Sequence, residues 1–123
     1  MMRKFAKLAV LFFMLMCLMG AGTVTFDAGQ PNPNPGGLLQ VLEGKGTYGP
    51  GQMETVGRVD MEVKETTTLT NSAKQANLKA GKWDCTINLV KGTYDVWATI
   101  ETVDNKGVII TKSCLPVKGV VVK

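Results

Sequence analysis

The sequence predicts an all-β domain, a two-sheet antiparallel sandwich of about seven short strands, preceded by a helical signal peptide. Three observations predict this fold class. Apolar and polar residues alternate in several segments, turn-forming residues separate these segments at intervals of about 8–12 residues, and nothing after the signal has a helical period. Thirteen threonines and thirteen valines also follow Gly22, and both residue types favour strands.

The N-terminus has the three parts of a secretory signal peptide. Residues 1–7 carry three basic side chains, Leu8–Met19 is an uncharged apolar run, and small residues follow it. We expect cleavage after Ala21 or Gly22, and therefore a secreted or periplasmic protein. A single N-terminal membrane anchor is the alternative, because no charge occurs between the start of the apolar run and Asp27.

The predicted domain organisation has three parts: a signal peptide at 1–22, a linker at 23–37 and a β-sandwich domain at 38–123. The linker is rich in Pro, Gly and Asn, and its alternating prolines are Pro31, Pro33 and Pro35. Because proline opposes both helix formation and sheet pairing, we expect an extended tether over these residues.

The apparent basicity of the chain comes mainly from its signal. The 123 residues include 14 basic and 10 acidic residues, for a formal net charge of +4. Arg3, Lys4 and Lys7 leave with the signal, so 11 basic residues remain against 10 acidic ones. No Lys or Arg cluster is left that could neutralise a row of phosphates. We expect no nucleic-acid partner, and membrane contact only through the export signal.

The chain contains no histidine. This excludes the commonest general base, the Ser-His and Cys-His nucleophile pairs and every metal site that uses histidine. No pair of acids stands out as a catalytic dyad either. We therefore expect a non-enzymatic protein without catalytic residues, metal site or cofactor.

The first predicted strands lie between Leu38 and Leu78. Leu38–Tyr48 forms a strand that ends at a Gly-Pro-Gly turn, and Arg58–Lys64 alternates without a break. The core face of the second strand carries Val59, Met61 and Val63. Residues 66–78 hold neither a strand nor a helix period, so we expect one or two short strands there.

Two well-patterned strands and a hairpin follow. Lys82–Leu89 places Trp83, Cys85, Ile87 and Leu89 on one face, and Thr93–Val103 places Tyr94, Val96, Ala98 and Ile100 on one face. Asp104–Gly107 is a hairpin signal. The last strand begins at Val108 and is broken at Pro116, which a sheet edge or a bulge tolerates.

Two cysteines remain once the signal, with Cys17, is removed. Cys85 and Cys114 form an even pair in an exported chain, which predicts one disulfide. Such a bond would stabilise the domain by roughly 3–4 kcal/mol. A redox pair is the alternative, although the CxxC spacing of thiol exchangers is missing.

Turn and core residues of the second half resemble those of bacterial immunoglobulin-like and fibronectin type III-like modules of exported proteins. The residues that carry this resemblance are Gly81-Lys82-Trp83, Leu89 with Gly92-Thr93-Tyr94, and Asp104 with Gly107. The resemblance covers residues 38–123 and implies an immunoglobulin-like sandwich with a role in structural support, adhesion or recognition.

The resemblance also implies that Tyr94 ties its hydroxyl to the backbone as a tyrosine corner. Trp83 alternates with core residues and is expected to pack among them. The cysteines depart from the antibody pattern, because they fall on the presumed E and G strands instead of strands B and F. A transthyretin-like or carboxypeptidase-regulatory-like sandwich is therefore the alternative topology.

Two aromatic residues are candidates for binding. Trp97 is predicted to lie on the outward face of its strand among Asp95, Thr99 and Glu101, where its ring could stack on a sugar or a partner. Tyr48 lies beside Gly46 and Gly49 and is a candidate loop contact.

The expected function is that of a non-enzymatic exported module with a structural, adhesive or protein-interaction role. Its partner would be a protein or a glycan at the cell surface. The alternative is a carbohydrate- or peptide-binding domain that uses the exposed aromatic, and a lesser alternative is an inhibitor of extracellular hydrolases.

Overall fold

The computed structural model describes residues 22–123, which form ten strands and one short 3-10 helix, η1 (Pro35–Gly37). The strands are β1 (Thr23–Phe26), β2 (Asn32–Pro33), β3 (Val41–Gly49), β4 (Glu54–Glu65), β5 (Asn71–Gln75), β6 (Asn77–Lys79), β7 (Lys82–Asn88), β8 (Gly92–Asp104), β9 (Ile109–Ser113) and β10 (Val117–Val122). The predicted signal peptide lies almost wholly outside these residues. Within residues 22–123, no helix has the length and apolar character needed to span a membrane.

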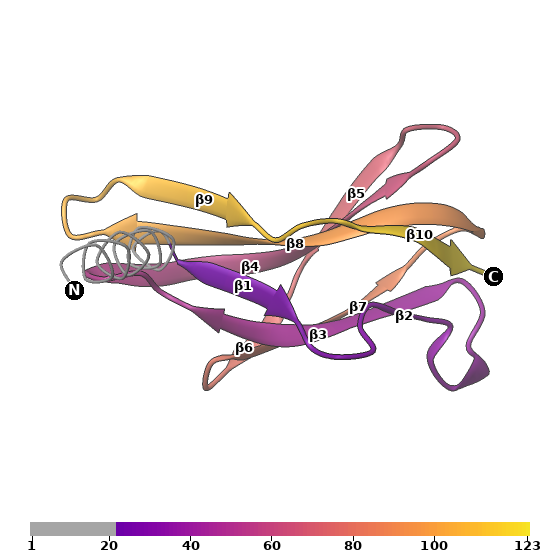
Figure 1. Ribbon diagram of the computed structural model, residues 1–123, viewed down its shortest axis with the longest axis horizontal. Coiled ribbons are helices and arrows are strands. Elements are labelled where there is room, and N and C mark those ends of the chain that lie inside the picture. Colours follow the sequence, from indigo (N-terminus) through magenta and orange to yellow (C-terminus); the bar gives the residue numbers. More distant parts are fainter. Residues whose placement is uncertain (1–21) are drawn as a thin grey trace, which may run out of the picture.

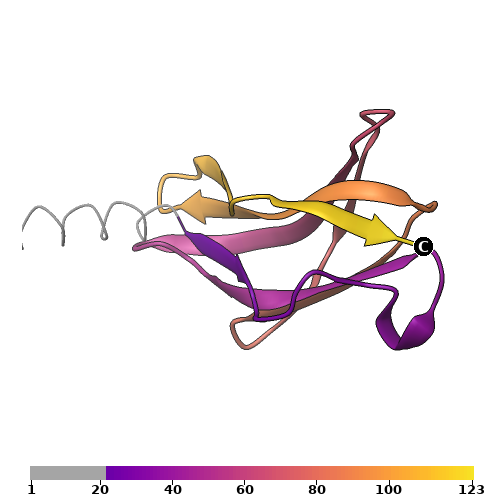
Figure 2. The same ribbon diagram turned by 45° about the vertical axis from the view of Figure 1, so that its right-hand side comes forward.

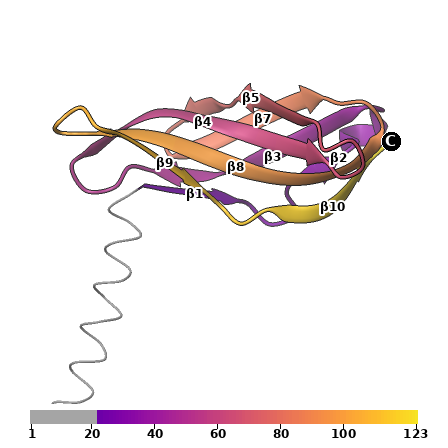
Figure 3. The same cartoon turned by 90° about the horizontal axis from the view of Figure 1, so that it is seen from above.

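The strands form two antiparallel sheets that pack face to face (Figure 1). Sheet A has the order β1-β3-β7-β6, and β2 also pairs with β3. Sheet B has the order β10-β8-β4-β5, and β9 also pairs with β8. Seen from above, the long strands β4 and β8 of sheet B lie side by side (Figure 3). The predicted all-β, two-sheet antiparallel sandwich is confirmed, with ten strands where about seven were expected.

The core lies between the sheets and follows the predicted alternation. In β4 the side chains of Val59, Met61 and Val63 are at most 1% exposed. In β8 every second residue from Tyr94 to Thr102 is buried. The long pairing of β4 with β8 therefore forms the centre of sheet B, because each strand presents a mainly apolar face to sheet A, with Thr102 as the buried polar residue of β8.

The expectation of a tether over residues 23–37 is wrong, because this segment belongs to the sandwich. β1 pairs with β3 from Thr23 opposite Gly49 to Phe26 opposite Gly46, and Pro33 lies in the short edge strand β2, where no backbone donor is needed. Asn34 has a positive φ of 53°. Its amide exchanges hydrogen bonds with the backbone of Lys123 at 3.0 Å in both directions.

The chain changes sheets in the poorly patterned region. β5 belongs to sheet B and β6 to sheet A, and the buried Ala76 between them donates its N–H to the carbonyl of Val59 at 2.8 Å. Both short strands are exposed along their length, which explains the missing period. The pink tip of the β4–β5 hairpin stands apart from the rest of the sandwich (Figures 1 and 2).

The break at Pro116 separates two strands that use the same partner. β9 pairs with the second half of β8 and β10 with its first half. The register shifts between Val117 and Val120, where Gly119 has a φ of 73°. The proline therefore lies at a sheet edge beside a bulge, as expected.

Trp83 is buried in the core at a place that two glycines leave open. Its Nε1 donates to the carbonyl of Thr25 at 2.9 Å, and its ring meets that of Phe26 edge-on at 5.4 Å. A Cβ at Gly44 would lie 3.0 Å from the indole. A Cβ at Gly46 would overlap the Thr25 carbonyl and lie 2.5 Å from Nε1. The indole and β1 thus occupy the space that side chains on β3 would need.

We predict that Gly46→Ala lowers the free energy of unfolding by about 3 kcal/mol, because the new methyl group displaces backbone as well as the indole. Gly49→Ala in the same strand is the matched control, since the nearest atom to its Cβ is Thr23 Oγ1 at 3.7 Å. That control should change stability by less than about 0.5 kcal/mol. Urea unfolding measures both, and equal stability of the two variants would contradict this account.

Candidate functional site

The predicted outward position of Trp97 is found in the structure. In β8 the residues on either side of Trp97 are buried, whereas Trp97 itself is partly exposed on the outer face of sheet B. Its partner in the ladder is Glu62 of β4. The indole Nε1 donates a hydrogen bond of 3.0 Å to Glu62 Oε2, which fixes the orientation of the ring.

Glu62 connects three strands across this face. Its Oε2 also accepts a hydrogen bond from the Thr99 hydroxyl, which in turn lies 3.0 Å from the hydroxyl of Ser113 on β9. Both bonds to the carboxylate use the same oxygen. Glu62 Oε1 makes no hydrogen bond or ion pair with any residue that the structure describes. One carboxylate oxygen is therefore available to a ligand beside an oriented aromatic ring.

A hollow of about 150 Å³ lies beside the indole. Besides Trp97 and Glu62, the residues that line it come mainly from β5 and are Val63, Asn71, Ser72 and Ala73. Ser72 stands opposite the core residue Val63, so its hydroxyl lies on the other face of the sheet. The hollow thus combines an aromatic ring, a carboxylate and an amide. These groups can hold a sugar ring or a polar side chain by stacking and hydrogen bonding.

Tyr48 does not join this site, and its expected position in a loop is wrong. Tyr48 lies in β3, opposite the buried Val24 of β1. It has the same strand parity as the buried Leu42, and its ring packs partly against the core. Trp97 lies on the outer face of the other sheet, so the two candidate aromatics are not brought together.

The Tyr94 hydroxyl donates to the carbonyl of Val90 at 2.6 Å, which is the backbone tie expected of a tyrosine corner. Burial, followed by the nearby charge of Glu65, raises the pKa of Tyr94, so the phenol remains a donor at neutral pH. Tyr94 holds the loop between β7 and β8 against the core.

The predicted disulfide is not formed, and both cysteines are free thiols. The thiol of Cys85 lies 3.7 Å from the carbonyl of Lys74 on β5, whereas the N–H of Ala98 on β8 donates to Cys114 Sγ at 3.2 Å. β4 lies between β5 and β8, so two strand spacings of about 4.8 Å separate these anchoring atoms. A disulfide needs its sulfurs about 2 Å apart.

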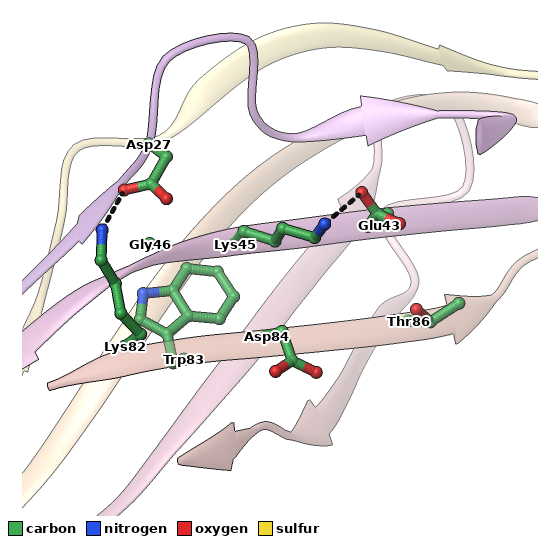
Figure 4. A pocket seen from close by; sticks show the side chains of 8 residues that line it. All are labelled: Asp27, Glu43, Lys45, Gly46, Lys82, Trp83, Asp84 and Thr86. Carbon is green, nitrogen blue, oxygen red and sulfur yellow. Dashed lines mark hydrogen bonds and ion pairs between the residues drawn. The ribbon is translucent and has the colours of Figure 1, made fainter. Parts of the chain in front are cut away.

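A charged groove of about 470 Å³ crosses the outer face of sheet A (Figure 4). Lys82 pairs with Asp27 at 3.5 Å, and Lys45 with Glu43 at 3.6 Å. Three of these four side chains are 41–62% exposed, so water screens the pairs and each contributes little. The indole of Trp83 lies below this groove and is only 2% exposed, so it offers no stacking surface.

The sequence does not predict this groove, because Asp27 falls in the segment 23–37 that is expected to be an extended tether outside the sandwich. The acidic and basic side chains of β3 and β7 could be found from their alternation, but the contribution of Asp27 depends on β1 docking against β3. No group of three or more metal-ligating side chains gathers within residues 22–123.

The tip of the β4–β5 hairpin is held by one carboxylate. Glu65 Oε2 accepts hydrogen bonds from the N–H of Thr67 at 2.9 Å and from both the N–H and the hydroxyl of Thr68. The bonds from Thr68 are the main reason that the pKa of Glu65 is lowered. The loop is therefore ordered by its own backbone donors.

Comparisons with known protein families, with curated proteins and with solved structures find no match to this chain. The fold and the surface chemistry therefore carry the functional argument.

We predict that reduction leaves the mass of the purified protein unchanged, because Cys85 and Cys114 are thiols. Burial raises the pKa of both thiols, so alkylation of the folded protein at neutral pH should be slow and should accelerate on unfolding. Mass spectrometry after iodoacetamide treatment measures both effects. A gain of a pair of hydrogen atoms on reduction would contradict the assignment.

The Glu65 carboxylate should order the hairpin in a pH-dependent way. Because its folded pKa is lowered, its contribution is present above the unfolded pKa and is lost as pH falls through the folded pKa. The amide resonances of Thr67 and Thr68 should titrate with a midpoint below that of an ordinary glutamate, and Glu65→Gln should abolish this transition. Glu43→Gln is the control, and a midpoint at or above the ordinary value would contradict the proposal.

Proposed function

We propose that this chain is an exported, non-catalytic module with an immunoglobulin-like sandwich that binds a protein partner through the outer face of sheet B around Trp97. The observation that carries the proposal is the indole held by Glu62 on a polar, threonine-rich sheet face. An oriented tryptophan can bury a large apolar area at little entropic cost, and this makes tryptophan common among residues that dominate binding energy.

Export is supported by the sequence of residues 1–22, with cleavage near Ala21 or Gly22 and a single membrane anchor as the alternative. A non-catalytic role is supported by the complete absence of histidine from the chain. The expected location is the periplasm or the cell exterior, and no cofactor or metal is needed for binding by this face.

A carbohydrate is the second candidate ligand, and the hollow beside Trp97 is the observation that favours it. Glu62 Oε1, which pairs with no residue that the structure describes, can accept a hydrogen bond from a sugar hydroxyl, while the Asn71 amide offers both a donor and an acceptor. The indole would then stack on the apolar face of the sugar ring. A protein partner would cover the ring more widely and depend less on Oε1.

We predict that Trp97→Ala weakens partner binding at least about tenfold, because among residues 22–123 Trp97 carries the only large ring on this face. Trp97→Phe keeps a ring but loses the bond to Glu62 and should retain part of the affinity. Binding is measured by capture of cell-surface proteins followed by titration of the captured partner, and in parallel on a glycan array.

The two ligand classes give different results with Glu62→Gln. This variant keeps an acceptor for the indole but removes the negative charge, so it should weaken glycan binding strongly and protein binding only slightly. Leu39→Ala, at an exposed residue outside this face, is the control and should bind normally. Equal binding by the wild type and Trp97→Ala would overturn the proposed role of this face.

A further inference from the structure

Two strand edges face each other without pairing where the β4–β5 hairpin leaves the sandwich. β5 pairs only with β4, and the part of β7 after Asp84 pairs only with β3. The two strands meet at their inner end, where the Cys85 thiol approaches the Lys74 carbonyl. Towards Ser72 and Asn88 they border a cavity of about 380 Å³.

The backbone groups of these edges point into the opening. The Lys74 ammonium donates a bond of 2.7 Å to the carbonyl of Thr86. The bonds from the Glu65 N–H to Thr70 and from the Ala76 N–H to Val59 show that Ser72 and Lys74 form hydrogen-bonded pairs with β4. Because alternate residues of a strand direct their N–H and C=O to opposite sides, Asn71 and Ala73 face away from β4, and Asn88 faces away from β3. Within the described part of the chain, these three residues have no backbone hydrogen-bond partner on that side.

The cavity beside these edges has an apolar floor and a hydroxyl-rich rim. Leu89 and Tyr94 are at most 7% exposed and form the floor, while Thr68 and Thr70 lie on the rim. The one carboxylate that lines it, Glu65, already holds the hairpin tip. The cavity is therefore preformed and suits one uncharged side chain.

The opposite side of the sandwich has less room for a further strand. A hollow of about 200 Å³ lies there between β1 and β9, whose free edges come within 8 Å of each other between Cα atoms. An added strand needs about 4.8 Å on each side, or about 10 Å between the edges that flank it. The β5 edge thus offers more space to an added strand than the edges of β1 and β9.

We propose that an extended segment of a partner protein adds to sheet B along β5. Its backbone pairs with the N–H and C=O groups of Asn71 and Ala73, and one apolar side chain enters the cavity above Leu89. Along one edge of a strand, the N–H donors and C=O acceptors of alternate residues recur about every 7 Å. An extended polypeptide has the same repeat. We therefore expect the ligand of this edge to be a peptide backbone.

This binding mode does not depend on the Trp97 ring. Ser72 lines both the hollow beside Trp97 and the cavity beside Tyr94, so the two sites adjoin. They are still separable, because backbone pairing along β5 involves no side chain of β8. If Trp97→Ala does not weaken binding, the proposed pairing along β5 is unaffected. If no peptide pairs with β5, the proposed role of the Trp97 face is unaffected.

The test uses a displayed library of random short peptides, selected on the purified protein. Ala73→Pro removes an N–H of the free edge but no ladder bond to β4, and Ala73→Ser is the matched control that keeps the N–H. The wild type and Ala73→Ser should enrich the same peptides, and Ala73→Pro should bind them at least about tenfold more weakly.

A second measurement covers the case in which Ala73→Pro does not fold. Enriched peptides with alternate N-methylated amides keep their side chains but cannot donate to β5, so they should lose binding to the wild type. Bound peptide should also slow amide hydrogen exchange at Asn71 and Ala73. No enriched peptide, undiminished binding of the N-methylated peptides, or unchanged exchange at these amides would overturn the proposal.

Discussion

The hydrogen bond from the Trp83 indole to the carbonyl of Thr25 is the constraint on which the rest of sheet A depends. The indole reaches this carbonyl only because Gly44 and Gly46 place no side chain between β7 and β1. The bond thereby holds three strands together from the inside, while the ladders join them along their edges. With β1 in place, Asp27 can pair with Lys82 across the outer face.

The strands with an unbroken alternation could be predicted from the sequence alone. β4 and β8 bury alternate residues because each is a central strand with one face on the core, and period-two patterning records this directly. The segment at 23–37 could not be predicted in this way. The prolines of this segment indicate only the local backbone conformation. The position of the segment depends on pairing with β3 and on the contact of Asn34 with Lys123, which are distant in the sequence.

Of the two central residues of the candidate site, only Trp97 could be placed from the sequence. The outward position of Trp97 follows from the parity of β8, but its partner Glu62 does not, because the register of β4 on β8 shifts between Val56 and Arg58. The bulge at Gly57 shifts the register by one residue, so that Glu62 and not Met61 stands opposite the indole. The disulfide between Cys85 and Cys114 was predicted from the even number of cysteines in the exported chain. That count does not show that Cys85 lies near β5 and Cys114 near β8, with β4 between these two strands.

The bonds between Asn34 and Lys123 also bear on the order in which the molecule can be completed. The two residues are 89 positions apart, and a polypeptide emerges from a ribosome or a translocation channel N-terminus first. Asn34 is therefore made well before the residue that it binds. During that interval the turn at Asn34 and the short strand β2 lack this support, and these bonds can form only after Lys123 has emerged.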